Sequence, residues 1–420
     1  MIETNKPTEK AFIVAVKLNE NSEDDIKESL NELKSLLDTA GAKVIKSFIQ
    51  NRSSIDPAFY IGIGKVEEIK KEAKENNIDT IVFDTELSPR QIRNLEKEIG
   101  KKILDRSWVI LDIFALRAKT REAKTQVELA QLKYFMPRLT RQWTHLSRQV
   151  GGGVGTKGPG ETQLETDKRL IKTRIAFLEK ELKEIEKQRI VQRKSREDEF
   201  KAVLVGYTNV GKSTLLNKLS NANVLAENRL FATLDSTTRI VELKNKKYFL
   251  LSDTVGFIRK LPHHLVASFK STLEEIKYAD LILHVIDVSH SHFREQIKTV
   301  EQVLADLKVL NKRTIYVFNK VDMLPKEDLE IINLEHFKSD KIFISAEKNI
   351  NIDKLKDKIL KIIEEDFRIK EFKVPIENSK LLSFIYQNSE VIREDYDDSH
   401  IKILIKAKTP NMEKIESNFK

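Results

Sequence analysis

The stretch LVGYTNVGKST, residues Leu204 to Thr214, decides the fold of this chain. It places Gly206, four further residues, and then Gly211, Lys212 and Ser213 between the apolar run AVLVG and the helical sequence KSTLLNKL. A turn of this kind between a strand and a helix is typical of a P-loop, in which backbone N–H groups and the helix N-terminus hold phosphate oxygens. The stretch therefore predicts an α/β nucleotide-binding domain with a mostly parallel sheet.

The chemistry of the loop assigns a role to each polar group. Backbone N–H groups from Asn209 to Ser213 are expected to hold the β-phosphate, the Lys212 ammonium to reach β- and γ-oxygens, and the Ser213 hydroxyl to bind Mg²⁺. The predicted nucleotide contacts in this loop are Gly206, Tyr207, Thr208, Asn209, Val210, Gly211, Lys212 and Ser213.

Two further motifs follow predicted strands. FLLSDTVGF ends with Asp253, placed to support the water shell of the metal, and with Gly256, whose N–H can donate to the γ-phosphate. IYVFNKVD ends with Asp322, whose carboxylate can accept hydrogen bonds from the N1–H and 2-amino groups of guanine, which adenine does not present. The motif therefore predicts GTP as the nucleotide. The contacts predicted here are Asp253, Thr254, Val255, Gly256, Asn319, Lys320, Val321 and Asp322.

Some roles at the base and at the metal stay open. Asn319 either bonds the N7 and O6 edge of guanine or braces the P-loop, and the Lys320 stem can cover the base. KIFISAEK supplies Ser345, Ala346 and Glu347, and the first two are expected to contact guanine O6 through their backbone. LFATLDSTTRI adds Phe231, Ala232, Thr233, Leu234 and Asp235, and a threonine of this stretch must complete the Mg²⁺ shell. The chemistry alone allows Thr233, Thr237 or Thr238.

A departure from the Ras-like pattern bears on catalysis. Phe257 follows DTVG, where Ras-like proteins carry a glutamine that orients the attacking water. A phenylalanine cannot hydrogen-bond that water, although it can simply pack. We therefore expect slow hydrolysis until a partner orders the site, and the residues present name no catalytic group.

The 420 residues predict several domains. Residues 1–115 alternate the apolar runs FIVAVKL, KVIKSFI, DTIVFD and WVILDIF with charged helical stretches such as SPRQIRNLEKEIG, which predicts a small parallel α/β domain of four strands. Residues 199–366 are expected to form the nucleotide-binding domain, and residues 367–420 a small α+β domain of order β-α-β-β-α.

Residues 116–198 are predicted to form an antiparallel helical hairpin. Ile171, Ile175, Leu178, Leu182 and Ile185 form one helical stripe, and the expected partner is the preceding helix with Val127, Ala130 and Tyr134 at helical spacing. The glycine-rich stretch QVGGGVGTKGPGE then falls at the tip of the hairpin.

The hairpin region carries most of the excess positive charge of the chain. Residues 116–150 hold eight basic and two acidic side chains, a net charge of +6, against +9 for the whole chain. Such a stripe either binds RNA phosphates or is a solvated helix face. The RNA-contact hypothesis names Arg138, Arg141, Arg148, Gly151, Gly152, Gly153, Gly155, Lys157, Gly158 and Gly160.

Composition excludes other classes of protein. The chain has no cysteine, so disulfides and thiolate metal sites are not available, and no apolar run approaches the roughly 20 residues of a membrane helix. The start of the sequence lacks an apolar signal region. We expect a cytoplasmic monomer with no DNA partner, and the sequence leaves peripheral membrane association open.

The motifs GGGVGTKGPGETQLETDKR, GYTNVGKST, FATLDSTTR, DTVGF and NKVD, together with LDIFALRAKTREAKTQVELAQLKY, resemble HflX, a family of bacterial translational GTPases. The resemblance covers nearly the whole chain and is most specific in the glycine-rich stretch. It implies Thr233 as the Mg²⁺ threonine, and partners in GTP, GDP, the large ribosomal subunit and its rRNA. It also implies a hairpin tip directed towards the peptidyl transferase centre, and GTP-dependent splitting or rescue of stalled ribosomes under stress. The alternatives are a GTPase of ribosome assembly or RNA modification and, against the evidence of NKVD, a nucleic-acid-binding P-loop ATPase.

Overall fold

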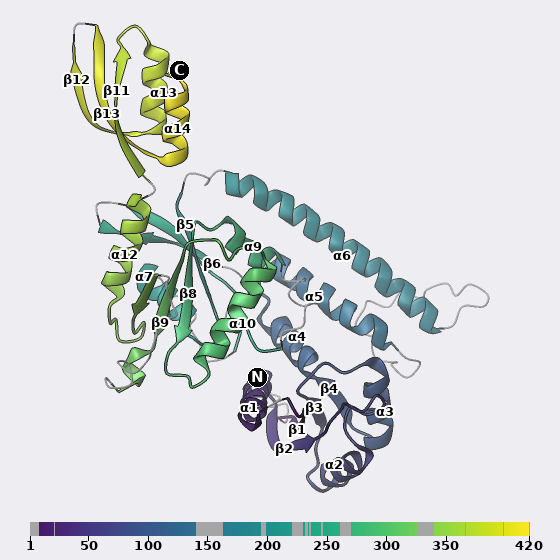
Figure 1. Ribbon diagram of the computed structural model, residues 1–420. Coiled ribbons are helices and arrows are strands. Elements are labelled where there is room, and N and C mark those ends of the chain that lie inside the picture. Colours follow the sequence, from purple (N-terminus) through teal and green to yellow (C-terminus); the bar gives the residue numbers. More distant parts are fainter. Residues whose placement is uncertain are drawn as a thin grey trace, which may run out of the picture.

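The computed structural model places a parallel α/β sheet, a helical hairpin, a larger mixed sheet and a small antiparallel sheet along the chain in that order (Figure 1). It describes residues 8–20, 22–139, 163–194, 199–220, 230–231, 234, 237–244, 247–260, 270–325, 340–365, 367–397 and 399–419. Within these ranges, no helix combines the length and the apolar character that a membrane crossing requires.

The N-terminal sheet has the order β2-β1-β3-β4 with all neighbours parallel, which confirms the predicted α/β layout. Its faces are covered differently: α1 packs against Ala11, Ile13 and Ala15, whereas α2 and α3 pack against Phe12 and Val14. The elements are β1 (Lys10–Lys17), α1 (Glu23–Thr39), β2 (Lys43–Asn51), α2 (Ile63–Glu75), β3 (Thr80–Phe83), α3 (Pro89–Ile99) and β4 (Lys102–Asp105).

The prediction of a strand at WVILDIF is wrong. These residues lie in helix α4 (Arg106–Arg117), which begins where the Asp105 side chain accepts the backbone N–H of Trp108 at 2.9 Å. A short apolar run does not distinguish a buried strand from a buried helix, and α4 buries Val109, Ile110, Leu111 and Phe114. The fourth strand is instead β4, directly before this helix, and the predicted boundary at residue 115 falls inside α4.

The helical hairpin consists of α5 (Arg121–Phe135), the 3-10 turn η1 (Met136–Arg138) and α6 (Gln163–Lys194), with α5 and α6 side by side (Figure 1). The predicted stripe on α6 is confirmed for Ile171, Ile175, Leu178 and Leu182, whereas its predicted partner face is wrong. Leu129, Leu132 and Leu139 pack against Ile171 and Leu178. Val127, Ala130 and Tyr134 lie on the other face of α5, in the cluster that includes α4. Helix α5 is thus apolar on two faces, so its own spacing could not identify the one that meets α6.

The larger sheet has the order β10-β9-β8-β5-β7-β6 and is parallel except for the edge strand β6. This is the mostly parallel sheet predicted around the P-loop. Its elements are β5 (Lys201–Gly206), α7 (Lys212–Ser220), β6 (Thr237–Glu242), β7 (Tyr248–Asp253), α9 (Lys270–Tyr278), β8 (Leu281–Asp287), α10 (Phe293–Asp306), β9 (Thr314–Asn319), the 3-10 turn η4 (Val321–Met323), β10 (Asp340–Phe343) and α12 (Ile352–Glu365).

The C-terminal unit confirms the predicted order β-α-β-β-α. Its antiparallel sheet has the order β11-β13-β12, and Phe372, Ile385, Ile403 and Ile415 form its core. The elements are β11 (Phe367–Pro375), α13 (Ser379–Asn388), β12 (Glu390–Tyr396), β13 (His400–Lys408) and α14 (Thr409–Ser417).

Candidate nucleotide-binding site

The P-loop lies where β5 ends and α7 begins, at the carboxyl edge of the larger sheet. Strand β5 is central and pairs with β7 and β8, so the loop is fixed from both sides. Gly211 has a φ of +94°, and a Cβ atom there would lie 2.4 Å from Asn319 Nδ2. Any larger residue at Gly211 would therefore push Asn319 away from the loop.

Lys212 is the buried cation of this loop. Its Nζ donates to the carbonyl oxygens of Tyr207 at 2.7 Å and Gly206 at 3.1 Å. Burial lowers the pKa of Lys212 to about 8, and Asp253 opposes this effect. A cation shielded from water interacts more strongly with phosphate than an exposed one does, which suits the role predicted for Lys212.

The predicted metal ligand Ser213 lies beside the predicted support for the metal's water shell. Ser213 Oγ donates to Asp253 Oδ2 at 2.7 Å, and Asp253 is fully buried. Hydroxyl and carboxylate oxygens are the donors that Mg²⁺ takes in phosphate sites, where substrate oxygens supply further ligands. The donor set therefore fits Mg²⁺. Among the described residues, no group of three or more His, Asp or Glu side chains forms a separate metal site.

Asn319 connects the P-loop with the segment that contains Ser345 and Ala346. Its Nδ2 donates to Val210 O at 2.8 Å, and its Oδ1 accepts the Ala346 N–H at 2.9 Å. Of the two roles open to Asn319, the geometry supports bracing of the P-loop. The backbone expected to contact guanine O6 is thereby held close to the phosphate loop.

The NKVD motif turns at Lys320, which has a φ of +66°. Lys320 Nζ forms an ion pair with Asp287 Oδ2 at 2.6 Å, and Asp322 is exposed in η4. Asp287 was not among the residues predicted from the sequence, although it ends the apolar strand LILHVID as Asp253 ends FLLSD. The contact of Asp322 with guanine stays a prediction.

The segment after β7 lies directly on the P-loop. Phe257 N–H donates to Gly206 O at 3.1 Å, and Phe257 O accepts the Thr208 N–H at 2.8 Å. A Cβ atom on Gly256 would lie 2.8 Å from Thr208 Cα. The Phe257 side chain is 2% exposed and packs in the core, so it offers no group that could orient water.

The stretch that contains the candidate metal threonines is described only in part. Phe231 is buried, and its ring centroid lies 4.6 Å from that of Phe114 in α4. Leu234 is buried too, and Thr238 Oγ1 lies 2.8 Å from Ser252 Oγ across the sheet. Ala232, Thr233 and Asp235 lie outside the described residues. Because the Thr238 hydroxyl bonds within the sheet, Thr233 and Thr237 remain the better candidates.

Arg138, predicted from the sequence as an RNA contact, also makes contacts within the chain. Its guanidinium lies 3.6 Å from the Tyr134 ring centroid and donates to Tyr134 O at 2.9 Å and Leu87 O at 3.0 Å. The side chain is 9% exposed, so it is committed to the junction of η1 with the N-terminal unit. The RNA contact of Arg138 stays a prediction, as does the rest of the RNA-contact set. Its remaining members, Arg141, Arg148, Gly151, Gly152, Gly153, Gly155, Lys157, Gly158 and Gly160, lie outside the described residues.

His284 is a residue near the site that the sequence analysis missed. It lies in β8 between Val205 and Tyr316 and is 1% exposed. Burial lowers the pKa of His284 to about 3, with a smaller effect from the Lys212 charge. The ring is therefore neutral at physiological pH, which keeps a second positive charge away from Lys212. The sequence could have indicated His284, because it is a histidine within the otherwise apolar run LILHVI.

The P-loop between a strand and a helix, the buried Lys212, the Ser213–Asp253 pair and the NKVD turn together define a P-loop GTPase. Family models of a GTP-binding GTPase N-terminal region, a GTP-binding GTPase middle region and a 50S ribosome-binding GTPase match residues 27–115, 117–196 and 201–320. The chain belongs to the HflX family.

Relatives named GTPase HflX match over most of both chains. That of Flavobacterium psychrophilum is 47% identical over 377 residues, which cover 85% of this chain and 91% of the relative. That of Caldanaerobacter subterraneus is 46% identical over 405 residues, covering 96% and 92%. That of Escherichia coli is 41% identical over 375 residues, covering 89% and 88%. The resemblance drawn from the motifs is confirmed.

Proposed function

We propose that this HflX GTPase binds the large ribosomal subunit and its rRNA through the helical hairpin and uses GTP to split or rescue stalled ribosomes under stress. Mg²⁺ is the proposed cofactor, and the cytoplasm the proposed location. The match of residues 201–320 to a 50S ribosome-binding GTPase supports the ribosomal partner.

The hairpin is the observation that carries this proposal. Helix α6 has 32 residues, about 48 Å at 1.5 Å per residue, and continues into the GTPase sheet, whereas α5 follows α4 of the N-terminal unit (Figure 1). Residues 140–162, which contain the glycine-rich stretch, connect the two helices. A partner that binds this connection is thus linked through α5 to the N-terminal unit and through α6 to the GTPase unit.

Each site residue has a separate proposed role in GTP binding and hydrolysis. Lys212 and the Gly256 N–H are proposed to neutralise and orient the γ-phosphate, and Asp322 to hold the base. Ser213 and Thr233 would hold Mg²⁺, and the bound ion would supply positive charge to the β- and γ-oxygens. Because Phe257 cannot orient water, the ribosome is expected to complete the site, directly or by ordering it.

Replacing Gly151 to Gly160 with a Ser-rich linker of equal length should abolish ribosome splitting. Glycines allow the backbone to approach RNA closely and to adopt turns with positive φ, and side chains would obstruct both. The nucleotide site lies elsewhere in the sequence, so GTP binding and basal hydrolysis should stay at the parental level. Loss of light scattering from whole ribosomes measures splitting, and phosphate release with and without ribosomes measures turnover.

Three outcomes separate the proposal from its alternatives. Splitting by the linker variant at the parental rate would show that the glycine-rich stretch is only a connection. Loss of basal GTP binding would place the stretch in the nucleotide site. A parent that binds isolated large subunits but never splits whole ribosomes would favour a GTPase of ribosome assembly or RNA modification.

Replacing Arg141 and Arg148 with Ala should weaken binding to large subunits and reduce its salt dependence. Each lost phosphate contact lowers the slope of log K against log salt by about 0.7 to 0.9, so the pair should lower it by about 1.4 to 1.8. Sedimentation with subunits at several salt concentrations measures the slope. The control replaces the exposed Lys71 and Lys74 of α2, and an equal slope in both variants would favour a solvated hairpin face.

A further inference from the structure

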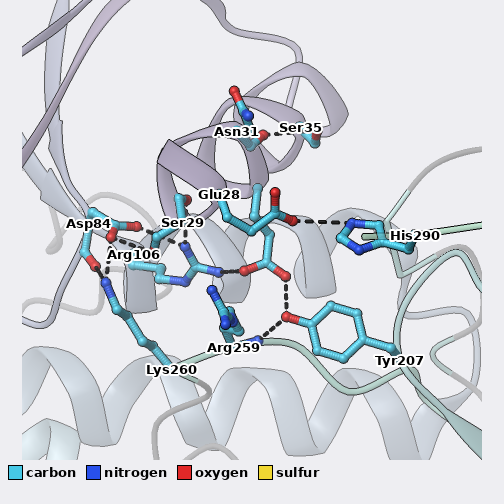
Figure 2. Close-up of polar contacts among 11 residues, drawn as sticks. Glu28, Ser29, Asn31, Ser35, Asp84, Arg106, Tyr207, Arg259, Lys260 and His290 are labelled. Carbon is cyan, nitrogen blue, oxygen red and sulfur yellow. Dashed lines mark hydrogen bonds and ion pairs between the residues drawn. The ribbon is translucent and has the colours of Figure 1, made fainter. Parts of the chain in front are cut away.

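Helix α1 presents acidic residues to the GTPase unit beside the P-loop. Figure 2 shows Glu28 of this helix facing His290. Asp25 pairs with Arg259 at 3.3 Å, Glu28 pairs with His290 at 3.2 Å, and Glu32 accepts a hydrogen bond from the Tyr207 hydroxyl. Residues three and four positions apart share one face of a helix. One face of the N-terminal unit therefore contacts the P-loop, the segment after β7 and the loop after β8.

The Tyr207 hydroxyl is the centre of this interface. It accepts the backbone N–H of Arg259 at 2.6 Å and donates to Glu32 Oε1, so both of its hydrogen-bonding roles are used. The second oxygen of Glu32 binds Arg106, whose side chain is 1% exposed. Tyr207 itself is 6% exposed. A P-loop side chain thus joins the segment after β7 to a buried ion pair of the N-terminal unit.

The same segment makes further contacts with the P-loop and with the N-terminal unit. We name residues 254–260 the switch II segment. Its Phe257 exchanges two backbone hydrogen bonds with Gly206 and Thr208, and Lys260 Nζ pairs with Asp84 Oδ2 at 2.5 Å. Figure 2 shows Lys260 and Arg259 reaching from this segment towards Asp84 and the N-terminal unit. The position of the switch II segment is thus set jointly by the P-loop and by the N-terminal unit.

Gly256 lies at the point where the γ-phosphate is expected. A Cβ atom on Gly256 would lie 2.9 Å from Lys212 Nζ, so the backbone of the segment stands directly against the ammonium. A γ-phosphate held by both the Lys212 ammonium and the Gly256 N–H must separate these two groups. That separation moves the segment that also supplies the Arg259 N–H to Tyr207.

We propose that Tyr207 is a positioning residue that couples the γ-phosphate to docking of the N-terminal unit. The hydrogen bonds that join Arg259, Tyr207 and Glu32 hold the switch II segment in the position that brings Gly256 against Lys212. GTP binding and this contact therefore oppose each other, whereas GDP leaves it in place. Coupling of this kind is reciprocal, so weakening the contact must favour GTP over GDP, up to the factor by which GTP weakens docking.

The test uses the full chain without ribosomes, so it is independent of the proposed ribosomal function. Tyr207→Phe removes one oxygen atom and keeps the ring and the Glu32–Arg106 pair. The ratio of affinities for a non-hydrolysable GTP analogue and for GDP, measured by calorimetry, should shift towards the analogue by about five- to tenfold. Tyr248→Phe is the matched control, because its hydroxyl also faces a glutamate, Glu199 at 3.5 Å, but lies at an exposed position of the GTPase unit.

Hydrogen exchange gives a second measurement, whose dependence on the nucleotide would not change if Tyr207 had only a structural role. In the parent, amides of α1 should exchange faster with the GTP analogue than with GDP, and in Tyr207→Phe this difference should vanish. Asp25→Asn weakens the Arg259 side-chain pair and leaves the Tyr207 hydroxyl in place, although it also alters the hydrogen bond from Ser22 Oγ to Asp25 Oδ2 at the start of α1. It should shift the affinity ratio in the same direction by a smaller factor. An affinity ratio within twofold of the parent in both variants, or a nucleotide-dependent exchange in α1 that survives Tyr207→Phe, would overturn the proposal.

Discussion

The variant Asp322→Asn should bind xanthosine triphosphate in preference to GTP. The Asp322 carboxylate is predicted to accept two hydrogen bonds from guanine, at N1–H and at the 2-amino group. Asparagine offers one acceptor and one donor, and this pair matches xanthine, which carries a carbonyl oxygen in place of the amino group. Two hydrogen bonds to a charged group contribute about 3 to 6 kcal/mol together, so GTP affinity should fall by about two to four orders of magnitude.

The substitution Asp322→Asn should leave the frame of the base site intact. Asp322 is exposed in η4, whereas the neighbouring Asn319 braces Val210 and Ala346 and Lys320 pairs with Asp287. The frame of the base site is therefore held by residues that the substitution leaves in place. Competition binding of GTP, xanthosine triphosphate and ATP measures the preference of parent and variant.

Asp306→Asn is the matched control, because Asp306 is an exposed aspartate at the end of α10. It should keep the parental preference for GTP. A variant Asp322→Asn that still strongly preferred GTP would remove Asp322 from the base site, and a parent that bound ATP equally well would remove the guanine assignment of the motif.

The larger sheet and its phosphate loop could be predicted because their signals are local. The P-loop needs consecutive residues of fixed type between a strand and a helix, and Asp253 and Asn319 each close an apolar strand. Parallel strands bring their carboxyl ends to one edge, so motifs far apart in the sequence meet there. The Ser213–Asp253 and Asn319–Val210 contacts follow from this arrangement.

The N-terminal and middle units were predicted less well because their apolar residues serve more than one partner. Helix α4 is buried on several sides, so its sequence is a continuous apolar run like that of a buried strand. Helix α5 is apolar on two faces. Arg138 looks like a free cation in a basic stretch until the fold brings Tyr134, Leu87 and Glu86 around it. The charge pattern of the sequence does not reveal which cationic side chains form contacts within the folded chain.

The contact between Tyr207 and Glu32 could not be predicted at all. The two residues are 175 positions apart and belong to units with separate sheets. Neither belongs to a motif through its side chain, since the P-loop contributes backbone at Tyr207. Only the packing of α1 against the GTPase unit brings them together, and local patterns carry no information on that packing.

The variant Lys212→Ala should lose GTP hydrolysis almost completely. The ammonium is buried, donates to two carbonyl oxygens of its own loop, and has a pKa that burial lowers to about 8. Phosphate oxygens would replace the water that this cation has lost, and the charge that develops on them in the transition state would be stabilised at short range. Removing one such preorganised donor costs about 10²- to 10³-fold in kcat, and the loss of a full charge should reach at least that range.

Lys218→Ala provides the matched control, because Lys218 lies in the same helix α7 and its side chain is only partly buried. Phosphate release under single-turnover conditions should fall for Lys212→Ala and stay at the parental rate for Lys218→Ala, and thermal unfolding of both variants checks that each one folds. The substitution also removes the Lys212 hydrogen bond to the Tyr207 carbonyl oxygen, whereas the Gly206 carbonyl oxygen keeps the Phe257 N–H as a donor, so a moderate loss of stability is expected. Undiminished hydrolysis by a folded Lys212→Ala variant would contradict the assignment of this loop as the phosphate site, because no backbone N–H group can substitute for a buried positive charge.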